Sequence, residues 1–146
     1  MADISSGNAP RAQLTVRPRG FTLLELMITV AIVAILAAAA LASYGYATVK
    51  SRRAAAKGCL TEGAQFMERY YTSNFTYAGA ALPACSSDVK PYYRVEFSGT
   101  PDGSSYVVQA VPLAGQARGD SLCGTLSINQ VGHRTESGTG SVADCW

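Results

Sequence analysis

The sequence contains little of what catalytic sites are built from. Of its 146 residues only one is a histidine, His133, which follows Val131 and Gly132 in a stretch typical of an exposed turn. No Gly-rich phosphate loop, no paired catalytic carboxylates and no activated nucleophile can be assembled from the residue spacings. We therefore expect a protein that is not an enzyme and that uses no cofactor.

Charge is also scarce, and the two signs balance. The chain has 12 Lys and Arg residues against 10 Asp and Glu residues. Removing the three arginines and one aspartate of the first 20 residues leaves nine basic and nine acidic residues in the remainder. A neutral chain lacks the electrostatic footprint of a nonspecific nucleic-acid-binding protein, so DNA is an unfavoured direct partner.

The longest stretch that is nearly free of charged residues is apolar. Between Phe21 and Ala42 the only charged residue is Glu25. About 20 apolar residues, at 1.5 Å each, cross a hydrocarbon core of roughly 30 Å, so this stretch predicts one membrane-spanning helix. Arginines precede it, which predicts a cytoplasmic N-terminus and an exported C-terminal part. The small residue of a cleavage site, Gly20, lies before the apolar run, whereas in a secretory signal it follows a shorter one.

An acidic side chain within such a helix needs an explanation. Burying Glu25 in lipid costs about 2.5–3.5 kcal/mol, so such a residue usually has a partner or a function. One interpretation is that Glu25 lies within reach of the membrane interface, one turn inside the helix. The other is that it pairs with a positive group in an assembly.

Four cysteines follow the apolar segment, and none of them forms a C-x-x-C metal-binding pair. An even number of cysteines in an exported domain predicts two disulfides and no metal site. Three connectivities can be drawn, and the spacing alone does not choose among them. The residues concerned are Cys59, Cys85, Cys123 and Cys145.

The junction at Gly20 resembles the class III leader of type IV pilins, through Arg19-Gly20-Phe21-Thr22-Leu23-Leu24-Glu25. The resemblance implies cleavage between Gly20 and Phe21 by prepilin peptidase and N-methylation of Phe21. It also implies assembly roles for Thr22 and Glu25, with Glu25 pairing with the Phe21 amino group of a neighbouring subunit. The expected parts are a leader (residues 1–20), a membrane-spanning and fibre-core helix (21–43) and a periplasmic globular domain (44–146).

Small residues in the apolar helix favour close helix packing. Ala34, Ala38 and Ala42 recur at i, i+4 and i+8, which predicts a packing face toward other helices. Many pilins have a proline where this chain has Ala42, so a proline kink is not expected here. Gly45 and Gly58 are the residues that could loosen the helix.

Beyond the membrane the pattern becomes amphipathic. Leu60, Ala64, Met67 and Tyr71 recur at helical spacing, as expected for a helix lying on a sheet. A basic cluster precedes this stripe and is interpreted as a solvated segment with extended side chains rather than as a lipid- or DNA-binding motif; it comprises Lys50, Arg52, Arg53 and Lys57.

Three short strands are expected in the C-terminal part. Alternating apolar residues and turn signals place them at residues 92–97, 105–111 and 122–128, with Pro112 ending the second. Residues 132–144 are polar and glycine-rich and read as a loop. A helical stripe on antiparallel strands predicts an α+β domain.

The C-terminal part also resembles PilE-type minor pilins. The matching segments are residues 64–71, 74–77, 106–112, 123–132 and 143–146. The resemblance implies the type IV pilin fold, a four-stranded antiparallel sheet and a Cys123–Cys145 disulfide. Cys59 and Cys85 are additional to that pattern, and their pairing follows from elimination and from the position of Cys85 in a loop.

These expectations combine into a structural minor subunit of a type IV pilus. Its partners would be other pilins, prepilin peptidase and the inner-membrane assembly platform. It would wait as a single-pass inner-membrane protein and then join a surface pilus that serves motility, adhesion or DNA uptake. The alternatives are the major pilin, a type II secretion pseudopilin and a DNA-binding competence pilin.

Overall fold

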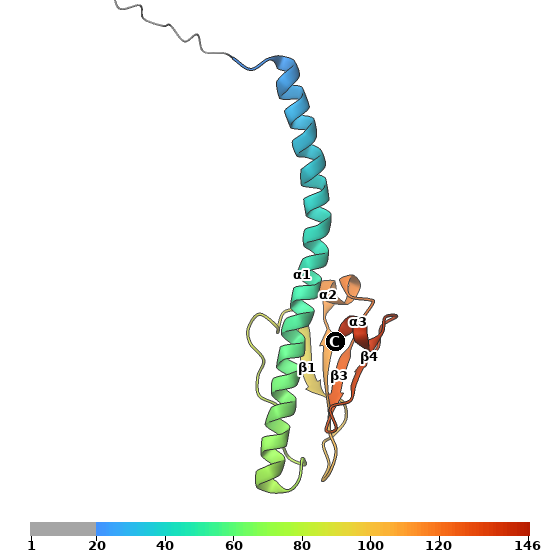
Figure 1. Cartoon of the computed structure of the whole chain (residues 1–146). Coiled ribbons are helices and arrows are strands. Elements are labelled where there is room, and N and C mark those ends of the chain that lie inside the picture. Colours follow the sequence, from blue (N-terminus) through green and yellow to red (C-terminus); the bar gives the residue numbers. More distant parts are fainter. Residues whose placement is uncertain (1–19) are drawn as a thin grey trace, which may run out of the picture. The chain divides into compact units, whose positions relative to one another are not determined.

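The computed structural model describes residues 20–146, so the prediction of a leader lies outside the described residues except at Gly20 (Figure 1). The chain divides into two compact units, of which the first ends at Ala38 and the second is Ala39–Trp146. Helix α1 (Leu23–Asn74) runs through the boundary, and it continues through Gly45 and Gly58 without a break.

The second unit is built on a four-stranded antiparallel sheet beside the C-terminal half of α1 (Figure 1). The strands lie in chain order, so β1 and β4 are the edges. This arrangement confirms the predicted α+β class, with a long helix packed on a small antiparallel sheet. The strands are β1 (Tyr93–Phe97), β2 (Val107–Pro112), β3 (Leu126–Asn129) and β4 (Arg134–Glu136), and the short helices are α2 (Ala114–Gly119) and α3 (Val142–Cys145).

The third predicted strand starts too early, because the chain turns before it. Gly124 has a φ of +60°, and Cys123 and Gly124 donate backbone hydrogen bonds to the carbonyl of Asp120. Leu122, the first residue of the predicted strand, is 45% exposed. Strand β4 and helix α3 lie in the segment predicted to be a loop, where short polar elements leave no periodic signal.

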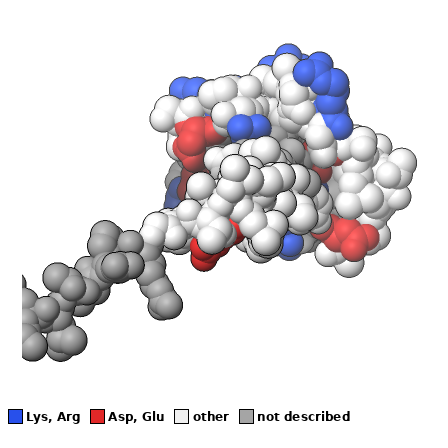
Figure 2. All heavy atoms as spheres, turned by 90° about the horizontal axis from the view of Figure 1, so that it is seen from above, with Lys and Arg blue, Asp and Glu red and all other residues white. Residues whose placement is uncertain are grey.

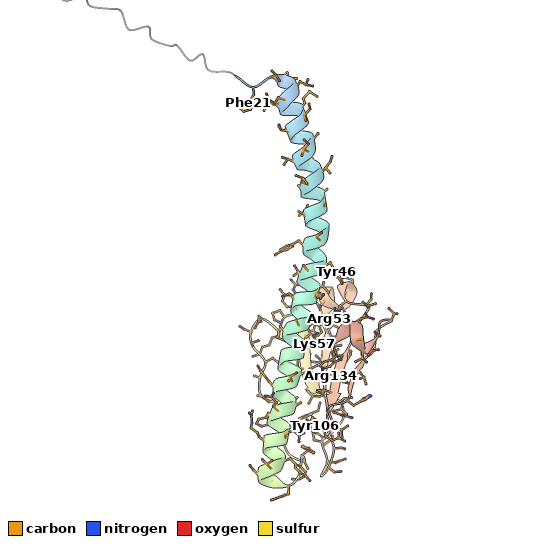
Figure 3. The ribbon with its side chains drawn as sticks, viewed as in Figure 1. Phe21, Tyr46, Arg53, Lys57, Tyr106 and Arg134 are labelled. Atoms are coloured by element: carbon orange, nitrogen blue, oxygen red, sulfur yellow. A yellow bond between two sulfur atoms is a disulfide. The ribbon has the colours of Figure 1, made fainter. Side chains whose placement is uncertain are left out.

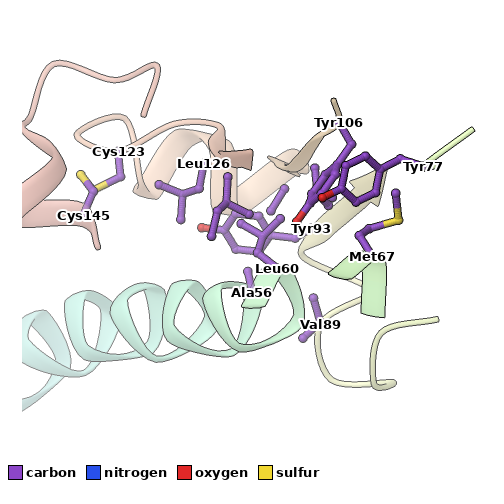
Figure 4. Close-up of a cluster of buried hydrophobic side chains, with 13 residues drawn as sticks. Ala56, Leu60, Met67, Tyr77, Val89, Tyr93, Tyr106, Cys123, Leu126 and Cys145 are labelled. Carbon is purple, nitrogen blue, oxygen red and sulfur yellow. A yellow bond between two sulfur atoms is a disulfide. The ribbon is translucent and has the colours of Figure 1, made fainter. Parts of the chain in front are cut away.

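The core forms where the helical stripe meets one face of the sheet (Figure 4). Leu60 and Met67 of α1 are fully buried, as are Val108 of β2 and Leu126 of β3. Alternate strand residues face the helix, and the β1–β2 register places Val95 opposite Ala110. Each buried side chain of this size contributes roughly 1.5–3 kcal/mol of hydrophobic stabilisation. The predicted stripe is thus the surface that holds helix and sheet together.

A buried polar cluster ties α1 to α2 and β1. Arg53 is only 6% exposed and forms an ion pair with Asp120, which corrects the expectation that Arg53 is solvated. The Tyr93 hydroxyl donates to Asp120 (2.8 Å), and the Gln116 side chain donates to Tyr93 (3.0 Å) and to the carbonyl of Val49 (3.1 Å). Burial, reinforced by the hydrogen bond to Asp120, raises the pKa of the Tyr93 hydroxyl.

Two disulfides close the remaining segments. Cys59 of α1 is bonded to Cys85 in the loop before β1, with Cα atoms 5.7 Å apart. Cys123 is bonded to Cys145 of α3, with Cα atoms 5.4 Å apart and a sequence separation of 22. A loop of this length, once closed, stabilises the fold by about 3 kcal/mol.

We predict that the Arg53–Asp120 pair is a major stabilising contact. Arg53→Gln leaves a buried carboxylate without its cation and should lower the free energy of unfolding by about 3 kcal/mol or more. Arg94→Gln breaks an exposed pair with Glu96 and should cost less than about 1 kcal/mol. Urea unfolding of the detergent-solubilised chain, followed by fluorescence of its one tryptophan, measures both values. Equal losses in the two variants would contradict this assignment.

Candidate assembly and binding surfaces

The residues predicted to act in processing and assembly lie together at the start of α1. Gly20 is exposed and Phe21 is 77% exposed. The Thr22 side chain accepts a hydrogen bond from the backbone N–H of Glu25 (3.2 Å). Thr22 therefore acts as the N-cap of α1, a role of which the Thr-x-x-Glu spacing is the sequence signal.

The first half of α1 exposes an unusually large apolar surface. Leu23 and Leu41 are both 75% exposed, and large apolar side chains between them are at least half exposed. By length and composition alone, α1 contains a segment that could cross a membrane. Ala34 and Ala38 share one side of the helix at i and i+4; the side chain of Ala42 is outside the description. Such a surface requires lipid or other helices to cover it.

A second surface carries basic residues from distant parts of the chain. Lys50 and Lys57 lie seven residues apart on α1, and therefore on the same side of it. The Lys57 ammonium donates to the backbone oxygen of Trp146 (2.8 Å), and the guanidinium of Arg134 lies 5.1 Å from the centre of the Trp146 ring. We call Lys50, Lys57, Arg134 and Trp146 the C-terminal basic face. Figure 3 labels Lys57 on α1 and Arg134 on the sheet.

The electrostatics of this face are local. Partial burial lowers the pKa of Lys57, and the nearby positive charges of Arg53, Arg134 and Lys50 lower it further. Residues 39–146 hold nine basic and eight acidic residues, a formal charge of +1. In the view of Figure 2, Lys and Arg side chains are spread over the surface with Asp and Glu side chains between them. The face is therefore a concentration of cations on a nearly neutral domain.

The remaining candidate for chemistry is the one histidine, which directly precedes Arg134. His133 is exposed in a turn, where its backbone N–H donates to the Asn129 side chain (2.9 Å). Within residues 20–146, no three His, Cys, Asp or Glu side chains are grouped so that they could hold a metal ion. The basic cluster predicted from the sequence contains Lys50 and Lys57 of this face, but Arg134 and Trp146 join them only through the fold.

Two family models match the chain. The model described as "Type IV minor pilin ComP, DNA uptake sequence receptor" matches residues 42–127. The model described as "Prokaryotic N-terminal methylation motif" matches residues 17–41. Comparison with curated proteins finds no match.

Solved pilin structures resemble this chain. A type IV pilin from Shewanella oneidensis is 32% identical, with a TM-score of 0.52, over 67% of this chain and 97% of that chain. The non-core minor pilin PilV of Neisseria meningitidis is 24% identical, with a TM-score of 0.50, over 67% of this chain and 93% of that chain. The second likeness concerns the fold alone.

These matches confirm the predicted pilin fold and the predicted minor-pilin class. The family is structural rather than enzymatic, and its members assemble with other pilins after a peptidase processes their leader. The N-terminal match and the apolar helix fit a subunit that is anchored in a membrane and then enters a pilus. The chain belongs to the type IV minor pilin ComP family.

Proposed function

We propose that this minor pilin is cut between Gly20 and Phe21 by prepilin peptidase, methylated on Phe21, and assembled into a type IV pilus through residues 21–43. The observation that carries the proposal is the apolar surface of the first half of α1, which the chain leaves exposed. Lipid covers that surface before assembly, and the helices of other pilins cover it afterwards. Residues 44–146 then form the part of the subunit outside the fibre core.

The same proposal includes an orientation of the chain in the membrane. Arginines before the helix favour a cytoplasmic N-terminus, and residues 44–146 then reach the periplasm. The two disulfides in this part support an oxidising compartment. The inner-membrane assembly platform moves the processed subunit from the membrane into the growing filament.

Glu25 is proposed to set the position of the subunit during assembly. Among the described residues, no hydrogen-bond donor contacts its carboxylate, while the N-cap role at this helix end is filled by the Thr22 hydroxyl. The carboxylate is therefore free to pair with the methylated amino group of Phe21 on a neighbouring subunit. In a low-dielectric fibre core, such a charge-assisted pair is strong and specific for one axial position.

We predict that Glu25→Gln enters sheared filaments at about one-tenth of the wild-type level or less, since losing roughly 1.4 kcal/mol changes an equilibrium tenfold. Quantitative immunoblots of filament and membrane fractions measure the ratio. Glu62→Gln makes the same charge change at an exposed position of the globular unit and should assemble normally. Thr22→Ala separates helix capping from pairing, because it removes the cap and keeps the carboxylate. Wild-type assembly of Glu25→Gln would refute the pairing.

A second candidate function is direct DNA binding by residues 44–146 during DNA uptake. The description of the matching family as a DNA uptake sequence receptor favours it. The neutral overall charge argues for a small, localised contact, because only a few phosphates can be neutralised without a broad basic surface. If DNA binding fails, the chain still acts through the filament, in motility, adhesion or uptake.

We predict salt-dependent binding of duplex DNA by the purified full chain in detergent. For a small contact of about three phosphates, the logarithm of the association constant should fall with the logarithm of salt concentration at a slope near −3. Fluorescence anisotropy of a labelled duplex measures this slope. Absence of binding at about 50 mM salt would reject DNA binding by this chain and leave its role as a pilin unaffected.

A further inference from the structure

We infer that the C-terminal basic face is the DNA contact of this pilin, with Lys50, Lys57 and Arg134 on backbone phosphates and Trp146 holding Arg134 in place. The inference rests on the proposed DNA binding and adds its location. It follows from the gathering of cations on this face, from their spacing and from the rigidity of the elements that carry them.

The cations of this face are gathered around Lys57, whereas two other basic residues of the globular unit are paired with carboxylates. Arg53 is paired with Asp120 and Arg94 with Glu96. Among the described residues, no Asp or Glu side chain forms an ion pair with Lys50, Lys57 or Arg134. Gathered cations attract an anion, and the positive charges of Arg134 and Lys50 add to the effect of partial burial in lowering the pKa of Lys57.

Their spacing suits a nucleic-acid strand. Lys50 and Lys57 are seven residues apart on one side of α1, or about 10 Å along the helix axis at 1.5 Å per residue. That distance corresponds to roughly three base pairs of a duplex, which rises 3.4 Å per pair on each strand. The two ammonium groups can therefore contact phosphates of one strand without bending the helix.

Arg134 is held in place by an aromatic ring. Its guanidinium lies 5.1 Å from the centre of the Trp146 ring, a distance at which cation and ring attract each other. The ring is itself fixed, because its N–H donates to the carbonyl of Thr135 (3.0 Å) and the backbone oxygen of Trp146 accepts from Lys57 (2.8 Å). A pre-positioned guanidinium loses less conformational freedom when it binds a phosphate.

A disulfide completes the rigid support. Trp146 directly follows Cys145, whose bond to Cys123 fixes the C-terminal segment against the turn before β3. The face therefore joins α1, β4 and α3 as one preformed surface. A preformed surface binds more tightly than a flexible one with the same contacts, because it loses less conformational entropy on binding.

The test uses two double variants with equal loss of charge. Lys50→Gln with Arg134→Gln removes the two exposed cations that do not contact the Trp146 backbone. Lys90→Gln with Arg94→Gln removes two exposed cations at and just before β1, the opposite edge of the sheet. Both are measured as full chains in detergent, by anisotropy of a labelled duplex. Because Trp146 is the only tryptophan, its fluorescence reports directly on this face.

We expect the Lys50/Arg134 variant to bind DNA about tenfold or more weakly, and its salt slope to become shallower by about two. The Lys90/Arg94 variant should change affinity less than about threefold, and DNA should alter the Trp146 emission of wild type. Wild-type chain that binds DNA without any change in Trp146 emission, or loses more affinity in the Lys90/Arg94 variant, would overturn the location. The location would also be overturned if the Lys50/Arg134 variant bound DNA as wild type does but entered filaments less well, because the face would then be a contact between subunits. No DNA binding by wild type would instead refute the underlying function.

Discussion

Among the described residues, the apolar side chains in the first half of α1 have no partner, and this constraint determines how the molecule can exist. Large apolar residues from Leu23 to Leu41 remain at least half exposed in the isolated subunit. Exposing so much apolar surface to water is unfavourable by tens of calories per mole for each square ångström. The helix is therefore stable only in lipid or among similar helices. A subunit that moves from the membrane into a filament keeps this apolar surface covered in both environments.

The globular unit, by contrast, buries a hydrophobic core of its own. Leu60 and Met67 bury the helical stripe on the sheet, and the Arg53–Asp120 pair and two disulfides fix the segments around it. This rigidity matters for the surface proposed to bind DNA, because the Arg134–Trp146 contact depends on a closed C-terminal segment. In the proposed account, the exposed first half of α1 serves assembly, and the packed globular unit carries the surface for DNA recognition.

The sequence predicted those features that depend on local pattern. The apolar run, the stripe through Leu60 and Met67 and the first two strands needed only periodicity and turn residues. The strand predicted from Leu122 starts too early, because the chain turns at Gly124 and the alternation of apolar and polar side chains does not reveal that turn. The burial of Arg53 was missed because its partner, Asp120, lies far away in the sequence. The C-terminal basic face was anticipated only through Lys50 and Lys57, because Arg134 and Trp146 lie far from them in the sequence.

The central claim, that this chain is a processed minor subunit of a pilus, is tested most directly by mass spectrometry of sheared surface filaments. The measurement gives the N-terminal residue of the protein and its abundance relative to the dominant pilin. The account predicts a chain that begins with methylated Phe21 and is present as a small fraction of the main subunit. Processed protein that stays in the membrane and never appears in filaments would contradict it, and would instead favour a secretion pseudopilin.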